Sequence, residues 1–303
     1  MSTSTKKIKS LHNVVVAIEP ISERSLSFQT FSKTIQKFQK HHVLPSTSIL
    51  SVIHPSLYSV PSSWYREAEN KYADEAAKNI EKNCQGTFDY SSVQILKGKA
   101  STNHYLVEEV SEYLKKIHSQ LLVVLSSNRQ GLPYWLVGSF AETAAFSATS
   151  SVLVVKPHLK NQEFSGKPRF TLALDASANY STRHLKWVID LVEPANAHVD
   201  IISVKPGKGI FSSLRKPESP KLANKELKHF EKELNDAGIS TSLSFIKEKD
   251  SVPQTIVDFA DKKKSWGIIT ITTERAIARK LLLGSTARKV LTLTKRPFFA
   301  VRL

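Results

Sequence analysis

The stretch "GSFAETAAFSATSSVLVVKP" at residues 138–157 returns at the end of the chain as "GSTARKVLTLTKRPFFAVRL" at residues 284–303. At an offset of 146 positions, Gly138 aligns with Gly284, and the serines that follow them also align. Each copy opens on Gly-Ser, continues through a segment with helical spacing and closes on an apolar run. Self-similarity over this length indicates that one structural unit is repeated in the chain.

The beginnings of the two units also match, since "NVVVAIEPISERS" (13–25) resembles "RFTLALDASANYS" (169–181). The chain has 303 residues, about twice the size of a typical domain. We therefore expect a first domain at residues 1–157 and a second at 169–303. The segment 158–168 between them is polar and aperiodic, which is typical of a linker.

Strand-like and helix-like segments alternate in both units. The strands expected are residues 13–18, 48–53, 92–96, 121–125, 152–155, 169–174, 198–204, 240–246, 267–271 and 298–301. The helices expected include residues 65–83, 104–118, 179–192, 222–236 and 252–262. Regular alternation predicts an α/β fold in which each domain is a doubly wound, Rossmann-like parallel sheet with helices on both faces.

Ligands of such sheets bind beyond the carboxyl ends of the strands, where the winding direction reverses. The first strand of each unit ends in an acid, Glu19 or Asp175, and the fourth strand leads into a polar loop before the Gly-Ser pair. These loops, at residues 126–137 and 272–283, are therefore the expected binding region.

A strand that ends in an acid, a serine-rich turn, and a fourth strand followed by a loop and Gly-Ser together resemble the universal stress protein family. The resemblance covers the whole chain and implies a tandem member with two such domains. In that family the short final strand lies at an edge and pairs subunits. The strands at 152–155 and 298–301 could then pair within the chain, making an intrachain pseudo-dimer without exposed edges.

In the ATP-binding branch of the family, the loop reads G-x2-G-x9-G-[S/T], and its amides and hydroxyl hold the phosphates. In the first unit the earlier glycines are replaced by Leu125 and Asn128, although asparagine tolerates a left-handed backbone. Arg129 adds a charge that could meet a phosphate. The nucleotide-site residues that the resemblance implies there are Glu19, Asn128, Arg129, Gly131, Gly138 and Ser139.

In the second unit the resemblance implies Asp175, Gly284 and Ser285. The positions of the earlier glycines hold Ile271 and Glu274, and a carboxylate there would repel phosphate. Both loops thus keep the final Gly-Ser and lose two glycines. ATP or another adenine nucleotide is the cofactor expected, with Mg²⁺ only as the nucleotide's companion.

Simpler interpretations of the same residues remain open. Each Gly-Ser pair could be only a helix N-cap, and each strand-end acid could cap the following helix. Ser181 is expected to be a cap or turn residue. Arg288 and Lys289, one turn into the last helix, could line an anion site or form a solvated face.

The composition sets the remaining expectations. A net charge of +16 favours a small anionic partner; the lysines are scattered and form no nucleic-acid motif, so a nucleic-acid partner is not expected. The single cysteine, Cys84, excludes a disulfide framework and indicates a buried, neutral thiol. No apolar run is long enough to span a membrane, and residues 14–18 are too few for a signal sequence, so we expect a cytoplasmic protein.

No nucleophile elbow, Walker loop or zincin motif occurs, and no histidine pair has metal-ligand spacing; His41 and His42 are adjacent and would point apart on a helix. The sequence therefore predicts a stress-response binding module that is not an enzyme. A scaffold that binds protein partners without nucleotide, a basic nucleic-acid-associated protein, and an enzyme of nucleotide hydrolysis or transfer with weak turnover remain as alternatives. The pseudo-dimer could also associate further into a homo-oligomer.

Overall fold

The structure, a computed structural model, describes residues 11–18, 26–53, 65–98, 102–126, 140–156, 164, 166–176, 178–205, 207, 220–272 and 284–302. The first half contains, in order, β1 (Val14–Ala17), α1 (Leu26–Lys40), β2 (Thr47–Ile53), α2 (Tyr65–Cys84), β3 (Tyr90–Lys97), α3 (Asn103–Lys116), β4 (Leu121–Leu125), α4 (Phe140–Ser147) and β5 (Ser151–Val155). The second half contains β6 (Arg169–Ala173), α5 (Thr182–Val192), β7 (His198–Lys205), α6 (Pro220–Asp236), β8 (Ser240–Lys247), α7 (Val252–Lys262), β9 (Gly267–Ile271), α9 (Ser285–Leu293) and β10 (Phe298–Val301).

The ten described strands form one sheet in the order β3-β2-β1-β4-β5-β10-β9-β6-β7-β8. All pairings within each half are parallel, and the order in the second half is the mirror of the order in the first. The α/β fold with a parallel-dominated sheet is therefore as the sequence predicts, and the repeat in sequence is a repeat in topology.

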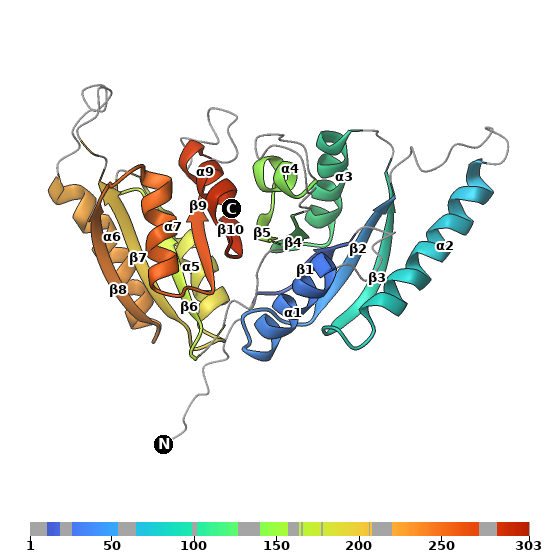
Figure 1. Cartoon of the computed structure of the whole chain (residues 1–303), viewed down its shortest axis with the longest axis horizontal. Helices are drawn as coiled ribbons and strands as arrows, with labels where there is room; N and C mark the ends of the chain where they lie inside the picture. The colour runs from blue at the N-terminus through green and yellow to red at the C-terminus, as the bar shows by residue number, and fades with distance from the viewer. Residues whose placement is uncertain are drawn as a thin grey trace, which may run out of the picture.

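The two halves meet where β10 pairs antiparallel with β5, in the register Phe298 with Val154 and Ala300 with Val152. The expected pairing of the two final strands is thus present. Figure 1 shows β5 and β10 in the middle of the molecule, with α2 and β3 at one end and α6 and β8 at the other.

Alternate side chains of the central strands pack into different cores. Leu121 and Val123 of β4 face one core, whereas Leu122 and Val124 face the other. The first core is completed by α1, α2, α5 and α6, and the second by α3, α4, α7 and α9. Strands covered on both faces read as continuous apolar runs, which is why β4 is "LLVVL".

The core under α1 and α5 is shared by the two halves. The ring of Phe38 on α1 lies 6.2 Å from that of Phe299 on β10 and 6.2 Å from that of Trp266, both in the second half. In the other direction, Trp187 of α5 donates its indole N–H to the carbonyl of Gln120 at 3.4 Å. Each half therefore completes the hydrophobic packing of the other.

Helix α5 begins at Thr182, three residues later than the sequence suggests, because Ser181 is its N-cap. The Ser181 hydroxyl lies 2.8 Å from Nδ1 of His184, and the Ser181 amide donates to the same nitrogen at 3.1 Å. The expectation that Ser181 is a cap residue is confirmed. Segment 179–181 is consequently outside the helix.

Candidate functional site

The described residues of the second half include most of one predicted site, which begins where β6 ends. The amide of Leu174 still donates to the carbonyl of Ile202 on β7 at 2.9 Å, and Asp175 is the first residue beyond the ladder. Asp175 is exposed at the carboxyl edge of the sheet. This is the edge at which ligands of doubly wound sheets bind.

The backbone of Asp175 is held by the phenol of Tyr180. The Asp175 amide donates to Tyr180 Oη at 2.7 Å, and the Tyr180 hydroxyl donates to the Asp175 carbonyl at 3.1 Å. Burial raises the pKa of Tyr180, and the Asp175 charge raises it further, so the phenol stays protonated and keeps donating. Because Ser181 caps α5, the alternative in which Asp175 caps that helix is wrong.

The start of α9 is the second part of this site. Gly284 is the N-cap, with φ −63° and ψ 154°, and the first helical hydrogen bond runs from the Arg288 amide to the Gly284 carbonyl at 2.9 Å. Ser285 is therefore the first helical residue, not the cap, and its side chain is exposed. The interpretation of Ser285 as an N-cap is wrong.

The described surroundings of Gly284 leave room at the start of α9. Its φ is negative, and a Cβ built there would meet no described atom within 4 Å. The amides of the first helical turn precede the first intrahelical hydrogen bond, as at any helix start. Such amides, together with the exposed Ser285 side chain, suit an anion.

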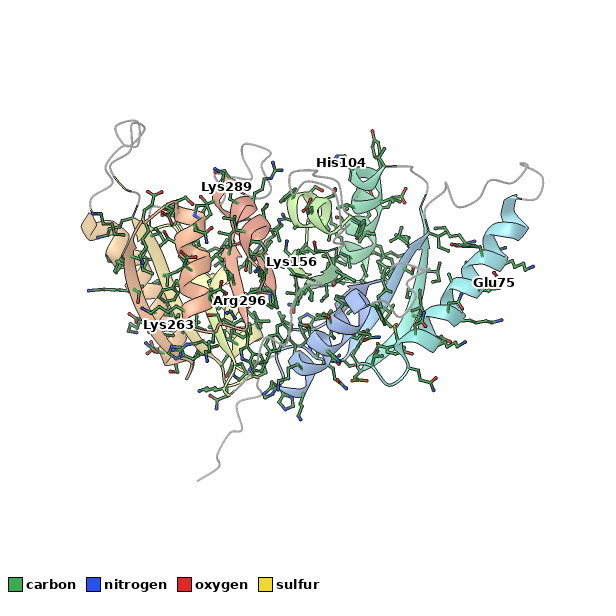
Figure 2. The ribbon with its side chains drawn as sticks, in the orientation of Figure 1. Glu75, His104, Lys156, Lys263, Lys289 and Arg296 are labelled. Atoms are coloured by element: carbon green, nitrogen blue, oxygen red, sulfur yellow. The ribbon has the colours of Figure 1, made fainter. Side chains whose placement is uncertain are left out.

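The basic residues near α9 have different roles. Arg288 and Lys289 are both exposed, and Figure 2 shows Lys289 beside α9 on the upper side of the second half. The Arg288 guanidinium lies 4.1 Å from the ring centroid of Phe146 on α4, a cation–π contact between the halves. Arg296 is buried and pairs with Asp261, 2.6 Å from Nε to Oδ1. It therefore anchors the segment before β10 and does not line the site.

The predicted site of the first half lies outside the described residues. Glu19, Asn128, Arg129, Gly131, Gly138 and Ser139 all belong to these segments. Their described neighbours are the ends of β1 and β4, which pair in parallel, and the start of α4 at Phe140. The loop residues Arg275, Arg279 and Lys280 of the second half also lie outside the described residues.

Two cavities open at the other edge of the sheet, where the sequence indicates no site. One, of about 640 Å³, lies between α1 and the turn before β3 and is lined by Lys33, Lys37 and Lys40 among others. The second, of about 390 Å³, is lined by Lys167, Arg169, His198, Lys263 and Lys264. The only sequence signal of the second cavity is the lysine run at 262–264.

Metal and thiol chemistry finds no support in the described part of the chain. No group of three or more metal-ligating side chains occurs there. His41 and His42 follow the end of α1 in a turn, and the His41 ring packs edge-on against Trp266, with centroids 4.9 Å apart. Cys84 is buried, as predicted, and burial raises its pKa to about 11. None of the described helices is long and apolar enough to cross a bilayer.

Comparison with known proteins identifies the second half. Residues 168–302 match the model of the universal stress protein family, so this segment is a universal stress protein domain. A search of curated proteins gives no match.

Solved structures extend the likeness to both halves. A universal stress protein from Archaeoglobus fulgidus DSM 4304 aligns with 95% of this chain and 96% of its own, at 15% identity and a TM-score of 0.62. A putative universal stress protein from Pseudomonas aeruginosa UCBPP-PA14 aligns with 97% of this chain and 94% of its own, at 16% identity and a TM-score of 0.59. At such identities the likeness is one of fold.

Proposed function

We propose that the chain is a tandem universal stress protein, with domains at residues 1–157 and 169–303 joined by a linker at 158–168. The family match of 168–302 supports the second domain. The sequence repeat and the mirrored strand order support the first. The antiparallel β5–β10 pairing supports an arrangement of the two domains as an intrachain pseudo-dimer.

We further propose that it is a regulatory binding module whose ligand is an adenine nucleotide, ATP or a relative. The observation that carries this proposal is the start of α9, where a Cβ built on Gly284 would meet no described atom within 4 Å and Ser285 is exposed in the first helical turn. A phosphate accepts from such amides and from the hydroxyl, while Asp175 at the same edge suits a ribose. The residues present therefore fit the nucleotide that the family resemblance implies.

The first domain would contribute the equivalent site through Gly138 and Ser139, with Glu19 in the place of Asp175. Asn128, Arg129 and Gly131 would line its loop. Because Glu274 stands in the second loop and no carboxylate stands at the aligned position of the first, the first site should bind the more highly charged nucleotide better.

The proposal is one of binding rather than turnover. Catalysis of nucleotide hydrolysis requires a positioned base or water-orienting group together with charge stabilisation at the γ-phosphate. Neither the sequence motifs nor the described residues around α9 supply such a group, since Arg288 is engaged with Phe146. Bound nucleotide would then act as a signal that biases the state of the protein.

Calorimetric titration of the full chain with ATP and with AMP, each with and without Mg²⁺, tests the proposal. Ser139→Ala weakens the first site, and Ser285→Ala in that background should weaken the remaining binding roughly tenfold or more, the value of a hydrogen bond to a charged group. Its melting temperature should not change, because the Ser285 side chain is exposed.

Ser251→Ala is the matched control. The Ser251 hydroxyl accepts from the Gln254 amide at 3.3 Å and caps α7, so this variant should lose about 1 kcal/mol of stability and keep nucleotide affinity. A folded wild-type protein that shows no heat at millimolar nucleotide would overturn nucleotide binding. Steady ATP turnover that Ser139→Ala abolishes would overturn the non-enzymatic assignment.

A further inference from the structure

The amino edge of the second half holds a cavity of about 390 Å³ lined by basic side chains from separate elements. Lys167 and Arg169 lie at the start of β6, His198 opens β7, and Lys263 and Lys264 follow α7. Figure 2 shows Lys263 at the opposite end of this half from Lys289 on α9. Arg169 and Asp175 are six positions apart, which at ~3.3 Å per residue puts the cavity roughly 20 Å from Asp175.

Backbone hydrogen bonds fix the elements that line the cavity. The amide of His198 donates to the carbonyl of Pro168 at 2.8 Å, and the amide of Trp266 donates to the carbonyl of Arg169 at 2.6 Å. The segment that carries Lys167 and Arg169 is thus clamped between β7 and the turn after α7. The cations are therefore gathered by rigid strands rather than by chance contact of flexible loops.

One buried acid offsets only part of this charge. Asp200 is fully buried beneath the cavity and accepts from Arg169 Nε at 2.7 Å and from the Ser242 hydroxyl at 2.7 Å. Burial and the Arg169 charge both lower the pKa of His198, so its imidazole is neutral at pH 7. The charged lining groups are Lys167 and Arg169 at the start of β6 and Lys263 and Lys264 after α7. Against the carboxylate of Asp200 they leave a net charge of about +3.

Lys264 follows α7 in a left-handed conformation, with φ +54°. Such a position normally favours glycine or asparagine, since a Cβ is strained there. His118 has the same conformation in the first half, so the backbone alone does not mark a site. The Lys264 side chain is one of the cations that line the cavity.

The same corner of the first half lacks the cations, although its backbone is alike. His118 is aligned with Lys264 and has φ +53°, and Ile117 is aligned with Lys263. Asn13 stands where the second half has Arg169, and its side-chain amide donates to the Ile117 carbonyl at 2.9 Å. The basic cavity is therefore not a requirement of the fold, because the repeat builds this corner without it.

Lysines near a helix C-terminus also interact favourably with the helix dipole, which offers a simpler account of Lys263 and Lys264. That account does not extend to Lys167 and Arg169, which belong to a different element. The convergence of both pairs on one hollow is what distinguishes a binding site from a solvated helix end.

We propose that this cavity is a second anion site, separate from the Gly284 site, which takes a compact diphosphate group. Lys167, Lys263 and Lys264 supply the charge, and Arg169, anchored on Asp200, supplies a fixed guanidinium edge. The volume equals that of roughly a dozen water molecules, which accommodates a diphosphate but not a stacked polynucleotide.

The test is calorimetric titration of the full chain with inorganic pyrophosphate, in a Ser139→Ala/Ser285→Ala background that weakens binding at the Gly-Ser sites. Lys264→Gly should weaken pyrophosphate binding about tenfold through loss of one close charge. Its melting temperature should not fall, since glycine relieves the left-handed backbone. Lys263→Gln should weaken binding to a similar degree.

Two control variants test whether weaker pyrophosphate binding comes from general loss of charge or from the change of backbone residue, rather than from loss of the site. His118→Gly makes the same backbone substitution in the other half, and Lys228→Gln removes one exposed charge from α6. Both should leave pyrophosphate affinity unchanged. Equal weakening by Lys228→Gln and Lys264→Gly, or no binding by the folded background variant, would overturn the proposal. ADP binding in the same background, lost in Lys264→Gly, would identify a nucleotide diphosphate as the source of the group.

Discussion

Cys84 shows how the environment of one side chain sets its chemistry. The thiol is fully buried at the end of α2, and burial raises its pKa from an ordinary value near 9 to about 11. In the unfolded chain the thiol ionises at the lower value. The folded protein therefore holds the proton over a window of pH in which the unfolded chain loses it.

The sign of the resulting pH dependence follows from this difference. Stability from the buried neutral thiol is fully present below about pH 9 and is lost as the pH rises toward 11. The free energy of unfolding of wild type should fall by about 1 kcal/mol more than that of Cys84→Ala between pH 8 and pH 10. Urea denaturation of both proteins at several pH values measures this. A difference between them that does not change with pH would contradict the buried, neutral thiol.

Residue-scale prediction from sequence succeeds where a local rule applies. The sequence predicts that Cys84 is buried because no motif surrounds it, and the structure confirms the burial. It predicts Ser181 as a cap because serine is favoured at helix N-termini. It fails at Ser285, because an adjacent glycine in extended conformation takes the N-cap position. Which of two neighbouring small residues becomes the cap depends on the direction from which the chain enters the helix.

Arg302, directly after β10, links that strand to a helix of the other half. Its buried guanidinium donates to the last carbonyls of α4, with Nη1 at 2.5 Å from the Ala148 oxygen and 3.3 Å from that of Ala144, and Nη2 bonded to Ala145. Burial lowers the pKa of Arg302 to about 10, so the group is still charged at pH 7. A cation at a helix C-terminus satisfies carbonyls that have no partner within the helix.

Arg302→Leu should therefore lower the free energy of unfolding by about 3 kcal/mol, because buried carbonyls lose a charged donor. The control is Lys156→Leu, since Lys156 is aligned with Arg302 in the repeat. Burial lowers the pKa of Lys156 and the Glu142 charge offsets part of this, so replacement by an apolar residue should cost less than loss of the Arg302 donor. Thermal melts of the two variants compare these effects, and equal losses would contradict the capping role.

At the scale of elements the sequence is most informative for buried strands. The bounds of β4, β9, β10 and α7 are those that the apolar runs and helical spacing indicate. Continuous apolar strands flanked by polar turns leave few alternative pairings. The basic cavity could not be predicted in this way, because Lys167, His198 and Lys263 are brought together only by the parallel register of β6, β7 and β9.

The two halves of the molecule are joined by aromatic packing around Phe299 of β10. Phe299 lies within ring-contact distance of Phe38 in the first half and of Phe170 and Trp187 in the second. Because each half buries apolar surface of the other, the two should unfold together rather than one after the other. The sequence repeat makes this organisation predictable, since two copies of one sheet with exposed final strands have a common way to bury them.

Phe299→Ala should destabilise both halves by about 4 kcal/mol, the usual range for removal of a buried aromatic side chain. Leu293→Ala is the control, because Leu293 is 44% exposed at the end of α9. Far-UV circular dichroism and tryptophan fluorescence should report one coincident urea transition in wild type and in both variants. Two separated transitions would show that the halves are independent folding units.

The β5–β10 pairing joins two halves of one chain. Partners joined by a chain meet at an effective concentration of the order of millimolar, whatever the amount of protein in solution. Dilution is therefore not expected to separate them. Two halves held in a fixed pair are free to differ, so one protein can carry a basic cavity on one side and an Asn13–Ile117 contact at the matching place on the other.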